Sequence, residues 1–198
     1  MSKWPQLKMN DSFKSGFTLI EILVALAISA LLVGSIYGLY VSTSRYYFKN
    51  IAQAELTQNG RIALERISRD LRQATRIITP LPPNESDPLN PPSSEILFQD
   101  GHDTSQISYI RYQLNGNSLK RQKIHYYFAL TPNVWVQWNT QDQNGNLPQE
   151  NIDEDVVKAD KLSSLKFYGS KNIFIDLTVA DNERQFGFKT LVFIRNIQ

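Results

Sequence analysis

The sequence predicts an α+β fold in which one long N-terminal helix packs its second half on an antiparallel β-sheet. Three observations support this prediction. Residues 22–41 contain no charged side chain, residues 64–78 place apolar side chains at helical spacing, and the chain after residue 95 alternates apolar and polar residues. Spacings of three and four are typical of an amphipathic helix, whereas alternation is typical of strands with one buried face.

A short basic leader precedes the apolar segment. Residues 1–16 include Lys3, Lys8 and Lys14 and end in Gly16. We expect this leader to lie outside the fold, and its positive charges predict that this end of the chain is cytoplasmic. Met1 and Met9 are both candidate translation starts.

Residues 17–41 are predicted to span a membrane as a helix, because a span needs about 20 residues. A single carboxylate, Glu21, lies near the start of this segment. An acidic side chain in a span is costly, which makes Glu21 a candidate functional residue. Gly34 and Gly38 predict either a place where the helix bends or a packing face of small residues.

The stretch Gly16-Phe17-Thr18-Leu19-Ile20-Glu21, with the apolar run after it, resembles the class III signal peptide of type IV pilins and type II secretion pseudopilins. The resemblance implies that a prepilin peptidase cleaves between Gly16 and Phe17 and that the new amine of Phe17 is N-methylated. It also implies that Glu21 pairs with the N-terminal ammonium of a neighbouring subunit and sets the axial register. The alternative is an ordinary signal anchor with one glutamate in its first turn.

Residues 42–79 are predicted to continue the helix as an amphipathic segment. Its apolar stripe consists of Leu64, Ile67, Leu71, Ala74 and Ile78, and prolines from Pro80 onward end it. A second face carries Arg66, Arg69, Arg72 and Arg76. These arginines indicate either a surface for nucleic acid or a partner, or a solvated face with helical charge pairs such as Glu65 with Arg69. The solvated face is the favoured interpretation.

Residues 80–198 are predicted to form an antiparallel β head. A proline-rich segment over 80–95 leads to strands at 96–98 and 106–114, and Asn115-Gly116 predicts a hairpin. Residues 131–160 are expected to be irregular, with Trp135 and Trp138 as packing residues. Strands at 162–168, 173–179 and 186–194 are expected to form a meander that covers the helix.

Three segments extend the resemblance beyond the leader. They are residues 61–74, Leu119-Lys120-Arg121 and the ending Val192-Phe193-Ile194-Arg195-Asn196, which look like minor pilins of the PilW type and minor pseudopilins of the GspJ type. This resemblance implies a pilin fold and a minor pilin in the initiation or tip complex of a type IV pilus. Its partners would be the peptidase and other minor and major pilins, with the inner membrane as its location before assembly into an extracellular filament. A minor pseudopilin of a type II secretion system is the alternative.

Composition argues against several other classes of protein. The chain has no cysteine and two histidines, His102 and His125, which excludes disulfides and argues against a multi-histidine metal centre. The net charge is +2, and removal of residues 1–16 leaves equal numbers of basic and acidic side chains, which argues against a DNA-uptake pilin. No catalytic motif is present, so we expect neither an enzyme nor a cofactor.

An acidic loop over 142–153 partly fits a calcium-binding template. The matching residues are Asp142, Asn144, Asn146, Glu150 and Asp153, at template positions 1, 3, 5, 9 and 12. Leu147 stands where the template requires glycine. A solvated loop without metal is therefore the favoured interpretation.

Overall fold

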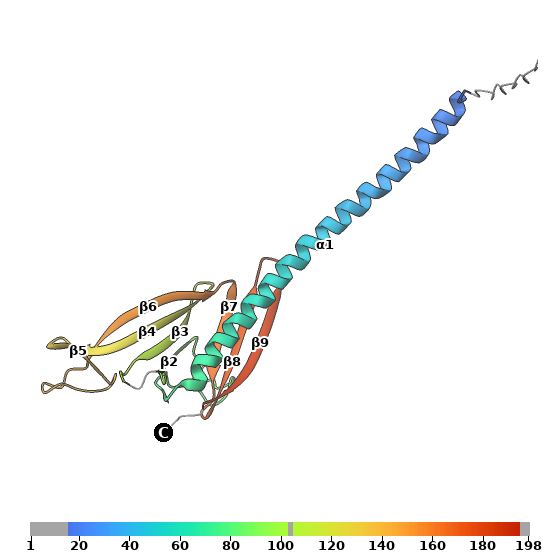
Figure 1. Ribbon diagram of the computed structural model, residues 1–198. Helices are drawn as coiled ribbons and strands as arrows, with labels where there is room; N and C mark the ends of the chain where they lie inside the picture. Colours follow the sequence, from blue (N-terminus) through green and yellow to red (C-terminus); the bar gives the residue numbers. More distant parts are fainter. Residues whose placement is uncertain (1–15, 103–104, 195–198) are drawn as a thin grey trace, which may run out of the picture. The chain divides into compact units, whose positions relative to one another are not determined.

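The computed structural model describes residues 16–102 and 105–194, and the chain divides into two compact units between Lys49 and Asn50. One helix, α1 (Leu19–Gln73), runs from the first unit into the second (Figure 1). In its described residues, the second unit also contains nine strands in two antiparallel sheets. The predicted α+β pilin fold is confirmed, with two sheets where one was expected.

The first sheet has the order β1-β2-β3-β4-β5. The strand β6 pairs with β4 as well, along the edge of β4 opposite to β3. Its strands are β1 (Arg76–Ile77), β2 (Glu95–Gln99), β3 (Tyr109–Asn115), β4 (Ser118–Phe128), β5 (Thr131–Val136) and β6 (Gln149–Ala159). The second sheet consists of β7 (Leu162–Tyr168), β8 (Asn172–Ala180) and β9 (Gln185–Phe193). This second sheet is the predicted C-terminal meander.

The β3–β4 hairpin turns on Gly116 and Asn117, because Asn115 pairs with Ser118. Gly116 has a φ of 60°, whereas Asn117 does not have a positive φ. A positive φ at the first turn residue alone is typical of a type II′ turn, which favours glycine at that position. The predicted hairpin is confirmed.

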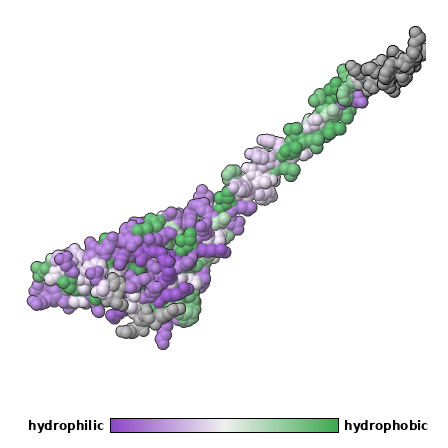
Figure 2. Space-filling model, in the orientation of Figure 1, coloured by the Kyte–Doolittle hydropathy of each residue, from purple (hydrophilic) through white to green (hydrophobic). Residues whose placement is uncertain are grey.

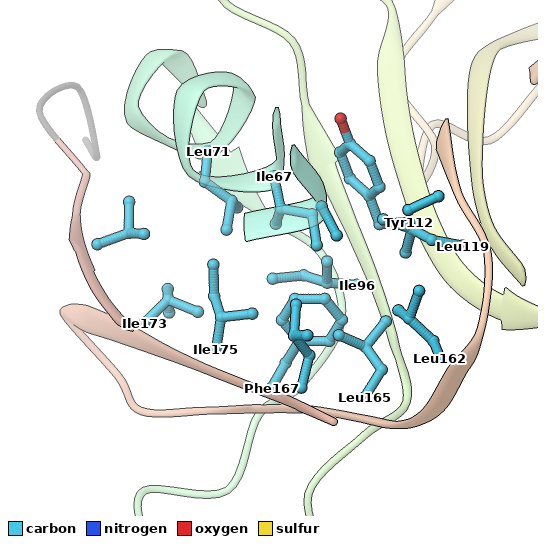
Figure 3. Packing of buried hydrophobic residues seen from close by; sticks show 14 of the residues in the cluster. Ile67, Leu71, Ile96, Tyr112, Leu119, Leu162, Leu165, Phe167, Ile173 and Ile175 are labelled. Atoms are coloured by element: carbon cyan, nitrogen blue, oxygen red, sulfur yellow. The ribbon is translucent and has the colours of Figure 1, made fainter. Parts of the chain in front are cut away.

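The main core lies between α1 and the two sheets. From α1 it receives Leu56, Ala63, Ile67 and Leu71, all fully buried. Figure 3 shows Ile67 and Leu71 of the helix above Ile96 and Phe167. Ile173 and Ile175 of β8 also face the helix from below in this view. The predicted stripe is therefore correct for Ile67, Leu71 and Ala74, whereas Leu64 is only half-buried.

The helix ends at Gln73, so its predicted end at Thr79 is wrong. Beyond the helix, Ile78 N donates to Leu97 O at 2.9 Å, and Leu97 N donates to the Thr79 hydroxyl at 2.8 Å. Residues 76–79 therefore run along the edge of β2, through the pairing of β1 and through these hydrogen bonds. Ile78 belongs to a separate small cluster with Leu97, Tyr109 and Ile124. Ile77, Ile78 and Thr79 are β-branched, a side-chain type that favours strands.

Residues 131–160 contain β5 and β6, so the expectation of an irregular segment is wrong. The strand β6 is stabilised by acidic side chains that meet basic ones of β4. Lys120 Nζ lies 3.2 Å from Asp155 and Arg121 Nη1 lies 3.1 Å from Glu154. His125 Nδ1 adds a hydrogen bond with Asp153 at 2.8 Å. Cross-strand pairs of opposite charge stabilise a sheet even where the strand propensity is low.

A buried polar cluster joins α1 to the first sheet. Asp70 of α1 accepts a hydrogen bond from the Tyr112 hydroxyl at 2.8 Å and another from Arg121 Nε at 2.8 Å. Asp70 is 3% exposed and Arg121 is 8% exposed, so each charge depends on the other for solvation. Burial, reinforced by the charge of Asp70, raises the pKa of Tyr112, which keeps its hydroxyl a donor.

Gly60 lets α1 approach β9. A Cβ atom at this buried position would overlap the Phe188 ring. We expect Gly60→Ala to lower the free energy of unfolding by about 1–3 kcal/mol although alanine favours helices, because overpacking outweighs propensity. Chemical unfolding of the detergent-solubilised chain measures this.

Gly187→Ala on β9 is the matched control, since a Cβ there meets nothing within 4 Å. Adding Phe188→Leu to Gly60→Ala should restore part of the stability. Equal stability of Gly60→Ala and the wild type would refute the close approach.

Candidate functional site: the N-terminal end of α1

Gly16 and Phe17 lie just ahead of Thr18, the residue before the helix, and belong to no helix or strand. Both are exposed, and the Phe17 side chain is 84% exposed. A Cβ atom at Gly16 would meet nothing within 4 Å. Both residues that flank the predicted cleavage bond are therefore accessible. The rest of the predicted leader, residues 1–15, lies outside the described residues.

Thr18 and Glu21 form a capping box at the start of α1. The Thr18 N–H donates to Glu21 Oε2 at 2.8 Å, and the Thr18 hydroxyl donates to the same oxygen at 3.0 Å. In return, Glu21 N lies 3.3 Å from the Thr18 hydroxyl. Thr18 directly precedes Leu19, the first helical residue, so Thr18 is the N-cap and Glu21 the third helical position.

The sequence interpretation missed this capping box, although Thr-x-x-Glu ahead of an apolar run is its usual signal. The box explains where the carboxylate points. It turns Glu21 back toward Phe17 and places its negative charge at the positive end of the helix dipole.

One oxygen of Glu21 remains for a further donor. All the hydrogen bonds to Glu21 within the described part of the chain reach Oε2, and none reaches Oε1. A carboxylate in apolar surroundings needs a cationic or hydrogen-bonding partner. The geometry is therefore compatible with capping the helix and receiving an ammonium group at the same time.

The apolar segment behind the capping box is exposed along its length. By length and composition, α1 is able to cross a membrane. Figure 2 shows hydrophobic side chains over this part of α1, whereas the globular unit is mostly hydrophilic on the visible face. The helix is continuous through Gly34 and Gly38, so neither glycine breaks it in the single subunit.

The four arginines do not form one exposed helical stripe. Arg66 is half-buried, Arg69 and Arg72 are exposed, and Arg76 lies in β1 beyond the helix end. Arg69 Nε lies 3.9 Å from Asp70, rather than in the expected pair with Glu65. These positions support the solvated interpretation for Arg69 and Arg72.

The residues that match the calcium template have other partners in the structure. The Asp142 carboxylate accepts hydrogen bonds from the backbone N–H groups of Asn144 and Asn146, each at 2.8 Å. The hydrogen bond from the Asn146 side chain, together with these backbone bonds, lowers the pKa of Asp142. The remaining acids point to other partners: Glu150 to Arg111 at 2.7 Å and Asp153 to His125. The template residues therefore do not converge on one point.

Trp135, Trp138 and both histidines make contacts within the globular unit. The rings of His125 and Trp135 are stacked with centroids 4.4 Å apart. Trp138 donates its backbone N–H to the hydroxyl of the buried Tyr109 at 3.1 Å. His102 contacts Asp100 in the loop after β2. The stacked ring agrees with the expectation that Trp135 is a packing residue. For Trp138 the expectation is wrong, because its side chain is exposed and only its backbone contacts Tyr109.

Comparison with known families adds to the geometry of the N-terminal end. A family model described as the prokaryotic N-terminal methylation motif matches residues 12–37, which include Gly16, Phe17 and Glu21. A search of curated proteins finds no match. The chain thus carries the prepilin-type methylation motif of type IV pilin-like proteins at the start of an α+β pilin fold.

Proposed function

We propose that this protein is a minor pilin, a structural subunit in the initiation or tip complex of a type IV pilus. The observation that carries the proposal is the exposed Gly16–Phe17 bond directly ahead of a capped helix of membrane-spanning length. Before assembly the apolar part of α1 anchors the subunit in the inner membrane with its N-terminus in the cytoplasm. In the filament, the same part of α1 packs among the helices of other pilins.

Glu21 has a role at assembly in this proposal. The ammonium of a neighbouring subunit's N-terminus neutralises the carboxylate in the apolar centre of the filament. Because desolvation offsets much of the attraction, the pair contributes axial register more than net stability. The free Oε1 and the capping box support this role, since they orient the carboxylate toward the end of the helix.

The second candidate function is a minor pseudopilin of a type II secretion system. Residues 61–74 and Leu119-Lys120-Arg121 resemble both groups, while the Arg195-Asn196 ending, outside the described residues, favours the pilus. Mass spectrometry of proteins that co-purify from the membrane separates the two functions. Pilus subunits among the partners would support a minor pilin, and secretion components would support a pseudopilin.

Replacing Gly16 with leucine should block processing, because a side chain at this position hinders the approach of the peptidase to the backbone. Intact-mass measurement of the wild-type protein should show loss of residues 1–16 and one added methyl group on Phe17. The variant should keep its leader.

Gly187→Leu is the control, because this exposed position on β9 also has open space and should not change processing. A Gly16→Leu protein that begins at Phe17 would overturn the assigned cleavage site.

A further inference from the structure

We propose that the free edge of β9 binds an extended apolar segment of another filament subunit, which adds to the second sheet as a further strand. This segment carries an aromatic side chain opposite Gly187 and apolar side chains on either side of it. The inference rests on the proposed function, because the partner that it names is a subunit of the same filament. It assigns an interaction surface to the globular unit, which neither peptidase recognition nor the Glu21 pair uses.

The strand β9 has a neighbouring strand on one side only. In the order β7-β8-β9, all nine residues of β9 pair with β8 without a register shift. Among the described residues nothing pairs with the opposite edge, and Figure 1 shows β9 as an outer strand of the second sheet. The backbone N–H and C=O groups of alternate residues therefore point away from β8, where another strand can bind them.

The sequence of β9 lacks the features that normally protect a sheet edge. Charged side chains, prolines and β-bulges keep edge strands from pairing with other chains. β9 contains no proline and no acidic residue, and its one charged residue is Lys189. Lys189 Nζ lies 3.0 Å from Glu85 and 5.2 Å from the centre of the Tyr168 ring in β7. Its charge is therefore directed across the sheet, away from the free edge of β9.

The strand β6 of the first sheet also has one free edge, and that edge is protected. β6 carries four acidic residues, Glu150, Asp153, Glu154 and Asp155, and its pairing with β4 shifts register at two places. The molecule thus protects one long edge strand and leaves the other regular and apolar. A regular apolar edge favours the addition of another strand, which indicates that β9 is a binding surface.

The side chains in the middle of β9 define what the added strand carries. Phe186 and Phe188 are partly buried against the main core. Gly187, between them, faces the other side of the sheet, is exposed and has open space where a Cβ atom would be. Residues directly opposite in neighbouring strands place their side chains on the same face, about 4.5–5.5 Å apart. Apolar side chains opposite the two phenylalanines extend the core, and an aromatic ring opposite Gly187 covers the glycine backbone.

A second copy of β9 is excluded as the partner by the direction of α1. The run Val192-Phe193-Ile194 has the required pattern, and Phe193 is 62% exposed, but its ring reaches the face of Gly187 only when the two strands are antiparallel. In the second unit α1 runs alongside β9 in the same direction, with Gly60 against Phe188 (Figure 1). Antiparallel copies would hold these parts of α1 antiparallel, whereas subunits anchored in one membrane have the same orientation. The partner is therefore a strand of a different subunit.

The test uses the full processed chain in nanodiscs and a fluorescent synthetic peptide with the sequence of residues 189–195, which contains the required run and no helix. Fluorescence anisotropy measures the binding of the peptide, and empty nanodiscs give the background. Two further peptides carry N-methylated amides, at residues 191 and 193 in one and at residues 192 and 194 in the other. Only one of these sets of N–H groups faces β9 in an added strand. One methylated peptide should therefore bind about thirtyfold more weakly, about fivefold for each lost hydrogen bond, while the other binds like the parent peptide.

The contact with Gly187 is tested by removing the aromatic ring from the peptide. The Phe193→Ala peptide should bind the wild-type chain about threefold more weakly than the parent peptide. The Gly187→Val chain should bind both peptides equally, because the valine side chain fills the space over the glycine. The matched control is Gln149→Val, which adds the same side chain to an exposed position of β6 and should keep the threefold difference. Because processing precedes assembly, a change at Gly187 affects this pairing and leaves cleavage after Gly16 unchanged.

Three results would each overturn the inference: no specific binding of the parent peptide, equal binding of the two methylated peptides, or a threefold difference that persists in Gly187→Val. Native mass spectrometry of the wild type from nanodiscs tests the choice of partner. A dimer that is lost in Gly187→Val would show that β9 pairs with a second copy and would overturn the assignment to a different subunit. All these results leave the minor pilin proposal intact, because that proposal depends on which proteins co-purify from the membrane.

Discussion

Replacing Glu21 with alanine should lower incorporation into the filament on the order of a hundredfold while leaving cleavage after Gly16 intact. The reason is that the neighbouring subunit's N-terminal ammonium would be left unpaired in the apolar filament core. Breaking a buried ion pair by removing one partner costs about 3–5 kcal/mol. Pili sheared from cells, compared with the membrane fraction, measure the incorporation.

The capping box allows the charge of Glu21 to be separated from its role in the helix. Glu21→Gln keeps an oxygen that can accept from Thr18 but removes the charge, so it should assemble as poorly as the alanine variant. Thr18→Ala removes the hydroxyl that caps the helix yet keeps the carboxylate. Its cost should be about 1 kcal/mol, so it should assemble better than either Glu21 variant.

Glu65→Ala is the matched control, because Glu65 is an exposed glutamate of the same helix. It should assemble like the wild type. Normal incorporation of Glu21→Ala in the shear assay would disprove the register role. A defect in Thr18→Ala as large as that in Glu21→Gln would show that capping, rather than charge, is what assembly requires.

Removal of the Asp70 carboxylate should destabilise the globular unit by about 3–5 kcal/mol. Asp70→Ala leaves Arg121 buried without its partner on α1 and leaves the Tyr112 hydroxyl without an acceptor. Urea unfolding of the detergent-solubilised chain measures the loss. The fluorescence of Trp135 and Trp138 reports on the first sheet.

The exposed pair of Lys120 and Asp155 provides the control for this experiment. Asp155→Ala should cost about 0–1 kcal/mol, because solvent screens an exposed ion pair. The double variant Asp70→Leu/Arg121→Met should recover much of the stability lost in Asp70→Ala, since it removes both buried charges. If Asp70→Ala and Asp155→Ala have equal stability, the buried pair does not hold α1 to the sheet.

The features that the sequence alone predicted correctly depend on neighbours along the chain. The apolar segment of α1, the stripe through Ile67 and Leu71, the Gly116 turn and the C-terminal meander all follow from local periodicity and turn chemistry. The motif around Gly16, Phe17 and Glu21 is likewise a contiguous pattern. The Thr18–Glu21 capping box was also readable from four consecutive residues and was overlooked.

Only the tertiary structure decided the features that join distant parts of the chain. Nothing near Asp70 in the sequence indicates that its partners are Tyr112 and Arg121, because two sheet strands bring them to the helix. The acidic segment of β6 has a composition typical of loops and becomes a strand because the basic side chains of β4 lie opposite to it. The helix ends at Gln73 rather than Thr79 because β2 offers hydrogen bonds to the following residues, an interaction that local propensity cannot contain.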